Sequence, residues 1–188
     1  MSKITAQWER EGYLLRSFQA GKAEKYFRDG FSRPDPEVNR LTGSAPASRE
    51  RVIAYYDRVV DDPDRYDFAI IAPDGTFLGE SVINEIDWDT RCANFRIALF
   101  QSRNCAKGLG TWAVEKTRDF AFGVLKLHRL ELDVFSFNPR ARRVYEKTGF
   151  RVEGIRKDAV LDGGAYADDI LMAMLEEDWQ KLKSGAEA

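Results

Sequence analysis

The stretch CAKGLGTWAVEK, residues 105–116, places two glycines and a lysine directly in front of an amphipathic helical pattern. Backbone N–H groups at a helix start lack intrahelical acceptors and carry partial positive charge, and glycines let an anion approach them closely. A tight turn before a packed helix explains the glycines as well, and it is the commoner reason for such a pair. The stretch therefore predicts a helix start, with phosphate binding as one of two interpretations.

Two named phosphate-binding motifs compete for this stretch. A P-loop requires a Lys-Ser or Lys-Thr pair after the second glycine, and none follows here. The run from Gly108 to Ala113 matches the dinucleotide pattern GxGxxG/A, and Asp133 stands where a ribose-binding acid would lie. However, polar residues 101–107 separate the glycines from the preceding strand, and no further βαβ series follows. A dinucleotide-binding fold is therefore disfavoured.

The composition is that of one globular domain, expected to span residues 1–188, with 44% hydrophobic and 32% charged residues. Because 29 Lys and Arg nearly balance 31 Asp and Glu, no nucleic-acid or membrane partner is expected. The chain start MSKITAQWER lacks a signal-peptide core, so a cytoplasmic location is expected. Cys92, Cys105 and the single histidine, His128, lack metal-site or disulfide spacing, so we expect a protein without a metal.

Periodicity and turn residues predict a mixed α/β protein. An Asp-Gly pair at 74–75 between alternating apolar runs is a strong hairpin signal, and Asn138-Pro139 supply a cap and a first-turn proline for a short helix. The expected elements in chain order are a strand (12–19), a helix (22–31), a long surface loop (32–48), a helix (48–60), three antiparallel strands (66–73, 76–88, 92–100), a helix (109–124), a strand (129–137), a helix (140–147) and two strands (150–161, 166–175).

Three blocks of the sequence together resemble a known family. CAKGLGTWAVEK is followed by LHRLELDVFSFNPRARRVYEKTGFRVEG (127–154) and GAYADDILMAML (164–175), as in the GCN5-related N-acetyltransferases (GNAT), in the branch of the ribosomal-protein acetyltransferases RimJ and RimL. The resemblance implies a seven-stranded mixed sheet flanked by about four helices. In that fold the sheet splays between its fourth and fifth strands, here 92–100 and 129–137, and acetyl-CoA lies in the gap.

The resemblance also implies which residues hold the cofactor. Backbone N–H groups from Ile97 to Leu99 would contact the thioester and pantetheine. Asn138 would bond pantetheine or an ordered water, although a pure helix cap is an equal interpretation. Arg142 and Lys147 could reach the nucleotide phosphates, although a solvated helix face is the commoner fate of such charges. The pyrophosphate loop of the family falls on Cys105, Ala106, Lys107, Gly108, Leu109 and Gly110, with Thr111 next.

Only some of the family's catalytic groups have a counterpart in this sequence. Tyr145 falls on the family's general-acid tyrosine, against the alternative of a core tyrosine. Many relatives have a glutamate near the position of Asn94, so that base is absent here. Glu85, which shares one face of the preceding strand with Asp87, is the candidate base, although an exposed acid is the commoner fate of such a residue. Cys105 stands where the family usually has Gln or Arg; a covalent acyl carrier beside a helix start is conceivable, but a substituted loop residue is the simpler interpretation.

These features predict an acetyl-CoA-dependent N-acetyltransferase in which a primary amine attacks the thioester directly. Deprotonating a lysine-like amine at pH 7 costs about 4.6 kcal/mol and an α-amine only about 1 to 1.4 kcal/mol, so a site without the family's glutamate favours a protein N-terminus. Acidic stretches at 61–64 and 85–87 suit a polyamine or aminoglycoside instead. Alternatives are a CoA-responsive binding module and an acyltransferase for another donor such as succinyl-CoA. A monomer or homodimer is expected.

Overall fold

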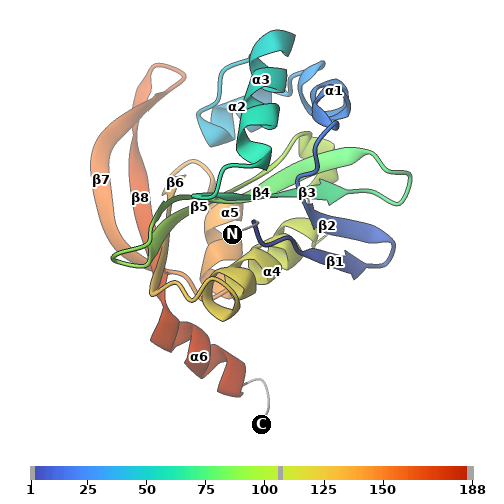
Figure 1. Ribbon diagram of the computed structural model, residues 1–188. Coiled ribbons are helices and arrows are strands. Elements are labelled where there is room, and N and C mark those ends of the chain that lie inside the picture. Colours follow the sequence, from blue (N-terminus) through green and yellow to red (C-terminus); the bar gives the residue numbers. More distant parts are fainter. Residues whose placement is uncertain (1–2, 106–107, 186–188) are drawn as a thin grey trace.

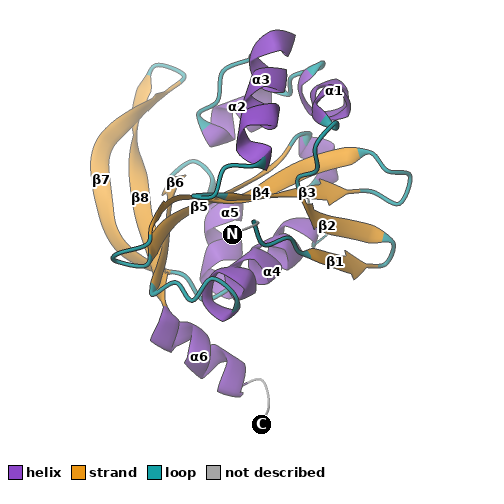
Figure 2. Ribbon diagram, viewed as in Figure 1, coloured by secondary structure: helices purple, strands orange, loops and turns teal. Residues whose placement is uncertain are grey.

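One twisted sheet of eight strands runs through the protein, with helices on both of its faces (Figures 1 and 2). The computed structural model describes residues 3–105 and 108–185. The strands lie side by side in the order β1-β2-β3-β4-β5-β6-β8-β7. Their bounds are β1 (Gln7–Arg10), β2 (Tyr13–Ser17), β3 (Tyr66–Ile71), β4 (Phe77–Asp87), β5 (Cys92–Leu99), β6 (Arg129–Phe135), β7 (Arg151–Asp162) and β8 (Ala165–Leu175).

The helices divide between the two faces of the sheet. α1, α2 and α3 cover one face, α4 and α5 cover the other, and α6 follows β8 at the end of the chain (Figure 1). Their bounds are α1 (Ala23–Tyr26), which continues as the π-helical turn η1 (Phe27–Phe31), α2 (Pro36–Thr42), α3 (Arg49–Val60), α4 (Leu109–Gly123), α5 (Pro139–Lys147) and α6 (Glu176–Gly185), with a 3-10 turn η2 (Ser102–Asn104) before α4. Each face therefore has its own hydrophobic core.

The larger core lies between the sheet and the α4–α5 layer. From α4, Leu109, Trp112 and Phe120 are buried against the sheet, as their helical spacing predicted. A buried hydrogen bond of 2.7 Å between the hydroxyls of Ser81 and Thr117 also ties α4 to β4. The smaller core joins α1 and α3 to the opposite face through stacked and tilted aromatic rings. Because β3 is covered on both faces, all six of its residues are buried.

The strands β5 and β6 run parallel but separate soon after they meet. Their pairing joins Cys92 to Arg129, Ala93 to Leu130 and Asn94 to Glu131, and it stops there. β5 nevertheless continues to Leu99 and β6 to Phe135. The sheet is therefore open along this edge, between the two strands for which the sequence predicted a splay.

The element count differs from the sequence prediction of seven strands and about four helices. The additional strand is β1, which forms an antiparallel hairpin with β2 over four residue pairs. Its four residues are too few to show a clear alternation, and a strand at the sheet edge needs none. The predicted helix over 22–31 is shorter, because α1 gives way to the π-helical turn at Phe27.

Two helices were missed by the sequence analysis. α2 lies inside the predicted loop 32–48, although its ends carry ordinary start and stop residues. Asp35 caps the start by accepting hydrogen bonds from the N–H groups of Glu37 and Val38, Pro36 is the first helical residue, and Gly43 ends the helix with φ +65°. α6 follows β8 without a break, so no turn residue marked its start. None of the helices in the described ranges is long and apolar enough to span a membrane.

Gly79 on β4 provides a test of the close approach between β4 and β5 at the open edge. An added Cβ there would lie 2.3 Å from the carbonyl oxygen of Ala98 and 3.0 Å from Cα of Leu99, both backbone atoms that cannot rotate away. We expect Gly79→Ala to lower the free energy of unfolding by about 1–3 kcal/mol, the usual cost of overpacking. The measurement is urea denaturation followed by circular dichroism.

Gly123→Ala is the matched control, because an added Cβ at the end of α4 would meet only ordinary contacts, at 3.6 Å, on the Trp179 ring. The control is expected to retain wild-type stability. Equal midpoints for the two variants would contradict the tight approach at Gly79.

Candidate active site

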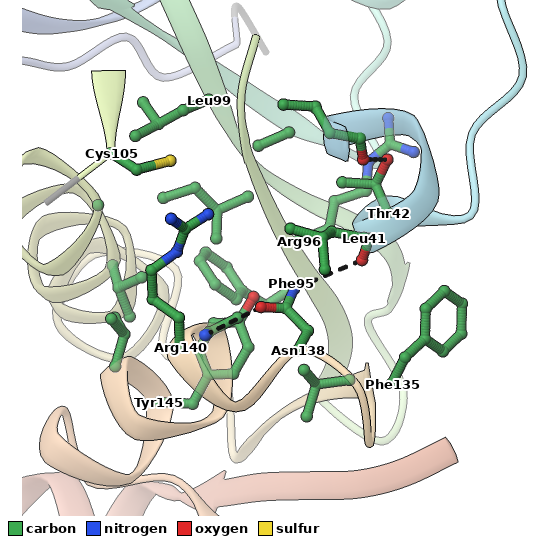
Figure 3. A pocket seen from close by; sticks show the side chains of 18 of the residues that line it. Leu41, Thr42, Phe95, Arg96, Leu99, Cys105, Phe135, Asn138, Arg140 and Tyr145 are labelled. Carbon is green, nitrogen blue, oxygen red and sulfur yellow. Dashed lines mark hydrogen bonds between the residues drawn. The ribbon is translucent and has the colours of Figure 1, made fainter. Parts of the chain in front are cut away.

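A cleft of about 420 Å³ opens where β5 and β6 part (Figure 3). Its walls come from α2, β4, β5, β6, the start of α4 and α5. These elements are far apart in the chain and meet only because the sheet is open at this edge. Eight of the residues with a predicted site role line the cleft: the predicted acid Tyr145 and the predicted cofactor contacts Ile97, Leu99, Cys105, Gly108, Gly110, Thr111 and Asn138.

One end of the cleft is the start of α4. Gly108 is the N-cap residue with φ +72°, a conformation that favours glycine, and no side chain caps the helix start. A Cβ at Gly110 would meet nothing within 4 Å, so the space beside the first turn is open. Uncapped N–H groups beside open space are a donor set that fits a phosphate. Leu109 points away from the cleft into the core, and Ala106 and Lys107 lie outside the described residues.

Among the described residues, the cations beside this helix start are Arg140 and Arg10, whose Nη1 donates to the carbonyl oxygen of Gly108 at 3.4 Å, and not Arg142 or Lys147. Arg140 lines the cleft, and its guanidinium extends from α5 toward Cys105 (Figure 3). Arg142 instead donates to Glu146 at 2.8 Å one turn further along α5, and Lys147 is exposed. Neither of them lines the cleft. Arg140, Arg142 and Lys147 share one short helix, so only the direction of each side chain, which the sequence does not give, separates them.

Tyr145 stands on the α5 side of the cleft. Its side chain is 6% exposed, and its ring packs edge-on against Phe95 at 6.3 Å between centroids. Within the described residues its hydroxyl makes no hydrogen bond, so it is available to a ligand. Burial, and then the charge of Asp133, raises the pKa of Tyr145 well above its usual range, so the phenol holds its proton at neutral pH.

The helix that carries Tyr145 is held at both ends. At its start, Asn138 accepts a hydrogen bond from the N–H of Ala141 at 3.2 Å and donates to the carbonyl oxygen of Leu41 at 3.5 Å (Figure 3). At its end, the buried Arg118 of α4 donates to the carbonyl oxygen of Thr148 at 2.7 Å. Asn138 is therefore a helix cap, as one of the two interpretations predicted, and it also lines the cleft.

The cleft is also lined by acidic groups to which the sequence analysis gave no catalytic role. Glu80 on β4 lies among apolar neighbours and lines the cleft, and a glutamate within such a strand was a readable signal. Its Oε2 accepts a 2.5 Å hydrogen bond from the hydroxyl of Tyr26, and its Oε1 lies 3.8 Å from Nη2 of Arg96. Burial raises the pKa of Glu80, against the opposing charge of Arg96. Asp133 on β6 also lines the cleft.

Glu85, the predicted base, lies elsewhere. It is exposed at a β-bulge between Asn84 and Asp87, with φ +54°, and it is not among the residues that line the cleft. Asp87 is occupied in a turn, where its carboxylate accepts from the N–H groups of Asp89 and Thr90. A bulge breaks the alternation of faces on which the prediction for Glu85 depended.

No group of three or more His, Cys, Asp or Glu side chains in the described part of the chain is arranged to hold a metal ion.

Cys105 is half-buried, and burial raises the pKa of its thiol although Arg140 opposes this. A reactive thiolate requires the opposite shift.

The comparisons with known proteins agree with this geometry. The profile described as "Acetyltransferase (GNAT) domain" matches residues 13–151. A probable N-acetyltransferase, YjcK, of Bacillus subtilis is 34% identical over 131 residues, which cover 69% of this chain and 72% of the relative. Spermidine N(1)-acetyltransferase of Escherichia coli is 32% identical over 124 residues, 66% of each chain.

A solved structure shows the same fold. Spermidine N-acetyltransferase of Vibrio cholerae in complex with CoA and spermine superposes with a TM-score of 0.78 at 23% identity, covering 91% of this chain and 99% of that one. The eight-stranded mixed sheet with its open edge is thus a GNAT fold. The chain belongs to the GNAT acetyltransferase family, and it is an N-acetyltransferase, an enzyme that transfers an acetyl group from acetyl-CoA to an amine.

The raised pKa of the Cys105 thiol leads to a prediction. We expect Cys105→Ser to keep turnover within about twofold of the wild type, because a thiol held protonated by burial is a poor acyl carrier. The measurement is steady-state release of CoA thiol with saturating amine, with mass spectrometry of the protein to detect acyl adducts. A loss of turnover beyond about a hundredfold, together with an acetyl adduct on Cys105 in the wild type, would contradict it.

Proposed function

We propose that this single acetyltransferase domain binds acetyl-CoA in the cleft between β5 and β6 and acetylates a primary amine that enters from the α2 side. The observation that carries the proposal is the arrangement along one cleft of the uncapped start of α4, the unpaired edge of β5 and the Tyr145 phenol. When bound, acetyl-CoA supplies an activated acetyl group. The protein's own residues hold it, orient it and move protons.

The proposed donor end is the first turn of α4. N–H groups at Gly110 and Thr111, with the Arg140 guanidinium beside them, suit a pyrophosphate, because they combine partial and full positive charge with a bare backbone. Past Asn94, the inner edge of β5 has no strand partner on β6, so backbone groups around Ile97 to Leu99 are free to bond pantetheine and the thioester oxygen.

Tyr145 is proposed to protonate the departing sulfur. A free phenol titrates near 10 and a thiol near 8.5, so this transfer is uphill by about 2 kcal/mol in water. Burial raises the pKa of Tyr145 further, but a thiolate formed in the same buried cleft is destabilised in the same direction. The phenol therefore remains an acid whose pKa is close enough to that of the departing thiol for proton transfer, and it is protonated at every pH where the amine is reactive.

Glu80, rather than Glu85, is the base we propose for the incoming ammonium group. Glu80 faces the cleft and has one oxygen held by Tyr26, while its other oxygen has only the distant Arg96 contact. A buried carboxylate with a raised pKa is a stronger proton acceptor than an exposed one. Glu80 thus replaces the glutamate that many relatives have near the position of Asn94.

Two acceptor classes each have an observation in their favour. The resemblance of residues 127–154 to the RimJ and RimL branch, and the low cost of deprotonating an α-amine, favour a protein N-terminus. The carboxyl groups of Glu80 and Asp133, which both line the cleft, favour a small-molecule amine with several positive charges, such as a polyamine.

Replacing Tyr145 tests the proposed function. We expect Tyr145→Phe to lower kcat by about 10²–10⁴-fold, because the general acid is lost, while Kd for CoA changes less than threefold. The measurements are thiol release from acetyl-CoA with peptide, polyamine and aminoglycoside acceptors, and titration calorimetry with CoA. Unchanged kcat in Tyr145→Phe would remove the acid role.

We expect replacement of Glu80 to lower activity and replacement of Glu85 to leave it unchanged. We expect Glu80→Gln to lower kcat/KM by about 10²–10³-fold and to remove the fall in rate at low pH that protonation of the base causes. Because the pKa of Glu80 is raised from 4.5, the wild-type rate should already fall at a pH above that value. Glu85→Gln is the matched comparison on the same strand, outside the cleft, and we expect it to behave as wild type. Loss of activity in Glu85→Gln together with wild-type activity in Glu80→Gln would instead identify Glu85 as the base.

A further inference from the structure

Three neighbouring strands carry charged side chains on the sheet face that α1 and α3 cover. In the two ladders, Asp67 of β3 and Arg96 of β5 are both directly opposite Val82 of β4. Glu80 is two residues from Val82 along β4, so its side chain lies on the same face, diagonal to both of them. The proposed base therefore shares this face with one anion and one cation from the adjacent strands.

The hydroxyl of Tyr55 on α3 meets these charged groups. It accepts hydrogen bonds from Nη2 of Arg65 and from Nη2 of Arg96, each at 2.7 Å, and it donates to Oδ1 of Asp67 at 3.4 Å. A hydroxyl has one donor and two acceptor sites, so all three are in use. Burial raises the pKa of Tyr55, so the hydroxyl stays neutral while it makes these bonds.

A buried ion pair holds this hydroxyl in place. The fully buried side chain of Asp67 accepts two hydrogen bonds from Arg65, from Nε to Oδ2 at 2.8 Å and from Nη2 to Oδ1 at 2.7 Å. The guanidinium of Arg65 also lies over the Tyr55 ring, 5.3 Å from its centroid. A bidentate pair of this kind has a specific geometry, so the Tyr55 hydroxyl is a fixed acceptor.

Arg96 is held by this hydroxyl. It lines the cleft, about half of its side chain is exposed, and within the described residues its guanidinium donates a hydrogen bond to Tyr55 alone (Figure 3). The same Nη2 lies 3.8 Å from Oε1 of Glu80, which is about 1 Å longer than a charge-assisted hydrogen bond. The hydroxyl therefore takes the donor that would otherwise be free to move onto the carboxylate.

The other groups around Glu80 leave the same oxygen open. Tyr26 of α1 donates to Oε2 at 2.5 Å, and the charges of Asp67 and Arg65 act on the carboxyl in opposite directions. A close ion pair at Oε1 would lower the pKa of Glu80 and occupy the oxygen with which it accepts a proton. The separation of Arg96 from Oε1 is thus what leaves the carboxylate a strong and accessible base.

We propose that Tyr55 is a positioning residue, which holds the Arg96 guanidinium away from Oε1 of Glu80 and so keeps this oxygen available for the proton of the incoming ammonium group. The inference rests on the proposed role of Glu80 as the base. Tyr55 is not among the residues that line the cleft, so it acts through Arg96 and not on a substrate.

Replacing Tyr55 tests the proposal on the resting protein. Tyr55→Phe removes the hydroxyl and keeps the ring, so Arg96 is free to close on Glu80, and we expect the pKa of Glu80 to fall by at least about one unit. The measurement is a ¹³C NMR titration of the full chain labelled at the glutamate side-chain carboxyls. The Glu80 signal is identified by its absence from Glu80→Gln. An unchanged pKa of Glu80 would overturn the proposal.

The pH profile of the reaction gives a second measurement. In the thiol-release assay, the acid limb of kcat/KM that Glu80→Gln removes should move to lower pH by the same amount in Tyr55→Phe. The plateau should fall by up to about tenfold, because a weaker base accepts the proton less readily.

Tyr56→Phe is the matched control. Tyr56 is the next residue on α3, and its hydroxyl bonds only to the backbone of Gln19 within the described residues, at 3.1 and 3.3 Å. Its pKa of Glu80 and its pH profile should stay at the wild-type values. A shift as large as that of Tyr55→Phe would show that loss of any hydroxyl from α3 has this effect, and would overturn the proposal.

Removing Arg96 tests the same contact without relying on the folding of Tyr55→Phe. We expect Arg96→Met to raise the pKa of Glu80 by less than about one unit, because a half-exposed guanidinium 3.8 Å away acts only weakly. A larger rise would show a close ion pair in the wild type and overturn the proposal. In the Arg96→Met background, adding Tyr55→Phe should cause no further shift; a further shift would show that Tyr55 does not act through Arg96.

The two measurements separate this inference from the proposed function. A fall in the pKa of Glu80 in Tyr55→Phe without any change in the pH profile would reject Glu80 as the base and keep Tyr55 as the residue that positions Arg96. Loss of activity in Glu80→Gln, together with an unchanged pKa of Glu80 in Tyr55→Phe, would keep the base and reject the role of Tyr55.

Discussion

The separation of β5 from β6 is the constraint on which the rest of the structure depends. Parallel strands stay together only while their backbone groups bond to each other, and here the ladder ends after three residue pairs. The remaining residues of both strands turn unpaired backbone groups toward the gap, and such groups need a partner when they are removed from water. An extended ligand that lies between the strands can supply it. The gap is therefore both a break in the sheet and the cleft.

Packing holds the helices that border this gap in place. On one side, α4 is held to β4 through Ser81 and Thr117, and its buried face packs against the sheet. On the other side, α5 is tied to α2 by Asn138 and to α4 by Arg118. These contacts place a helix start at one end of the cleft and a buried phenol beside its middle. Strand separation alone would give only a gap, and the helices supply the N–H groups and the phenol that can act on a ligand there.

The lining of the cleft combines charges of both signs. Glu80 and Asp133 supply carboxyl groups, and Arg96, which is bonded to Tyr55, offsets the charge of Glu80 only in part. The proposed donor end combines the start of α4 with Arg140. A cleft lined both by a helix start with Arg140 and by the carboxyl groups of Glu80 and Asp133 suits two substrates of opposite charge, which agrees with a phosphate-bearing donor and a cationic acceptor.

The sequence by itself determined the class of the fold, the parting of the strands 92–100 and 129–137, and Tyr145 as a cleft residue, because local periodicity, turn residues and the resemblance of residues 105–116 and 127–154 carry that information. Only the tertiary structure decided which charged side chains meet. Arg140 replaced Arg142 and Lys147 because neighbouring residues on one helix point in different directions. Glu80 lines the cleft while Glu85 does not, because a bulge changes the strand's alternation after Asn84. Arg96 meets Tyr55 because α3 packs over the sheet beside Glu80, a contact between residues 41 positions apart that no local pattern encodes.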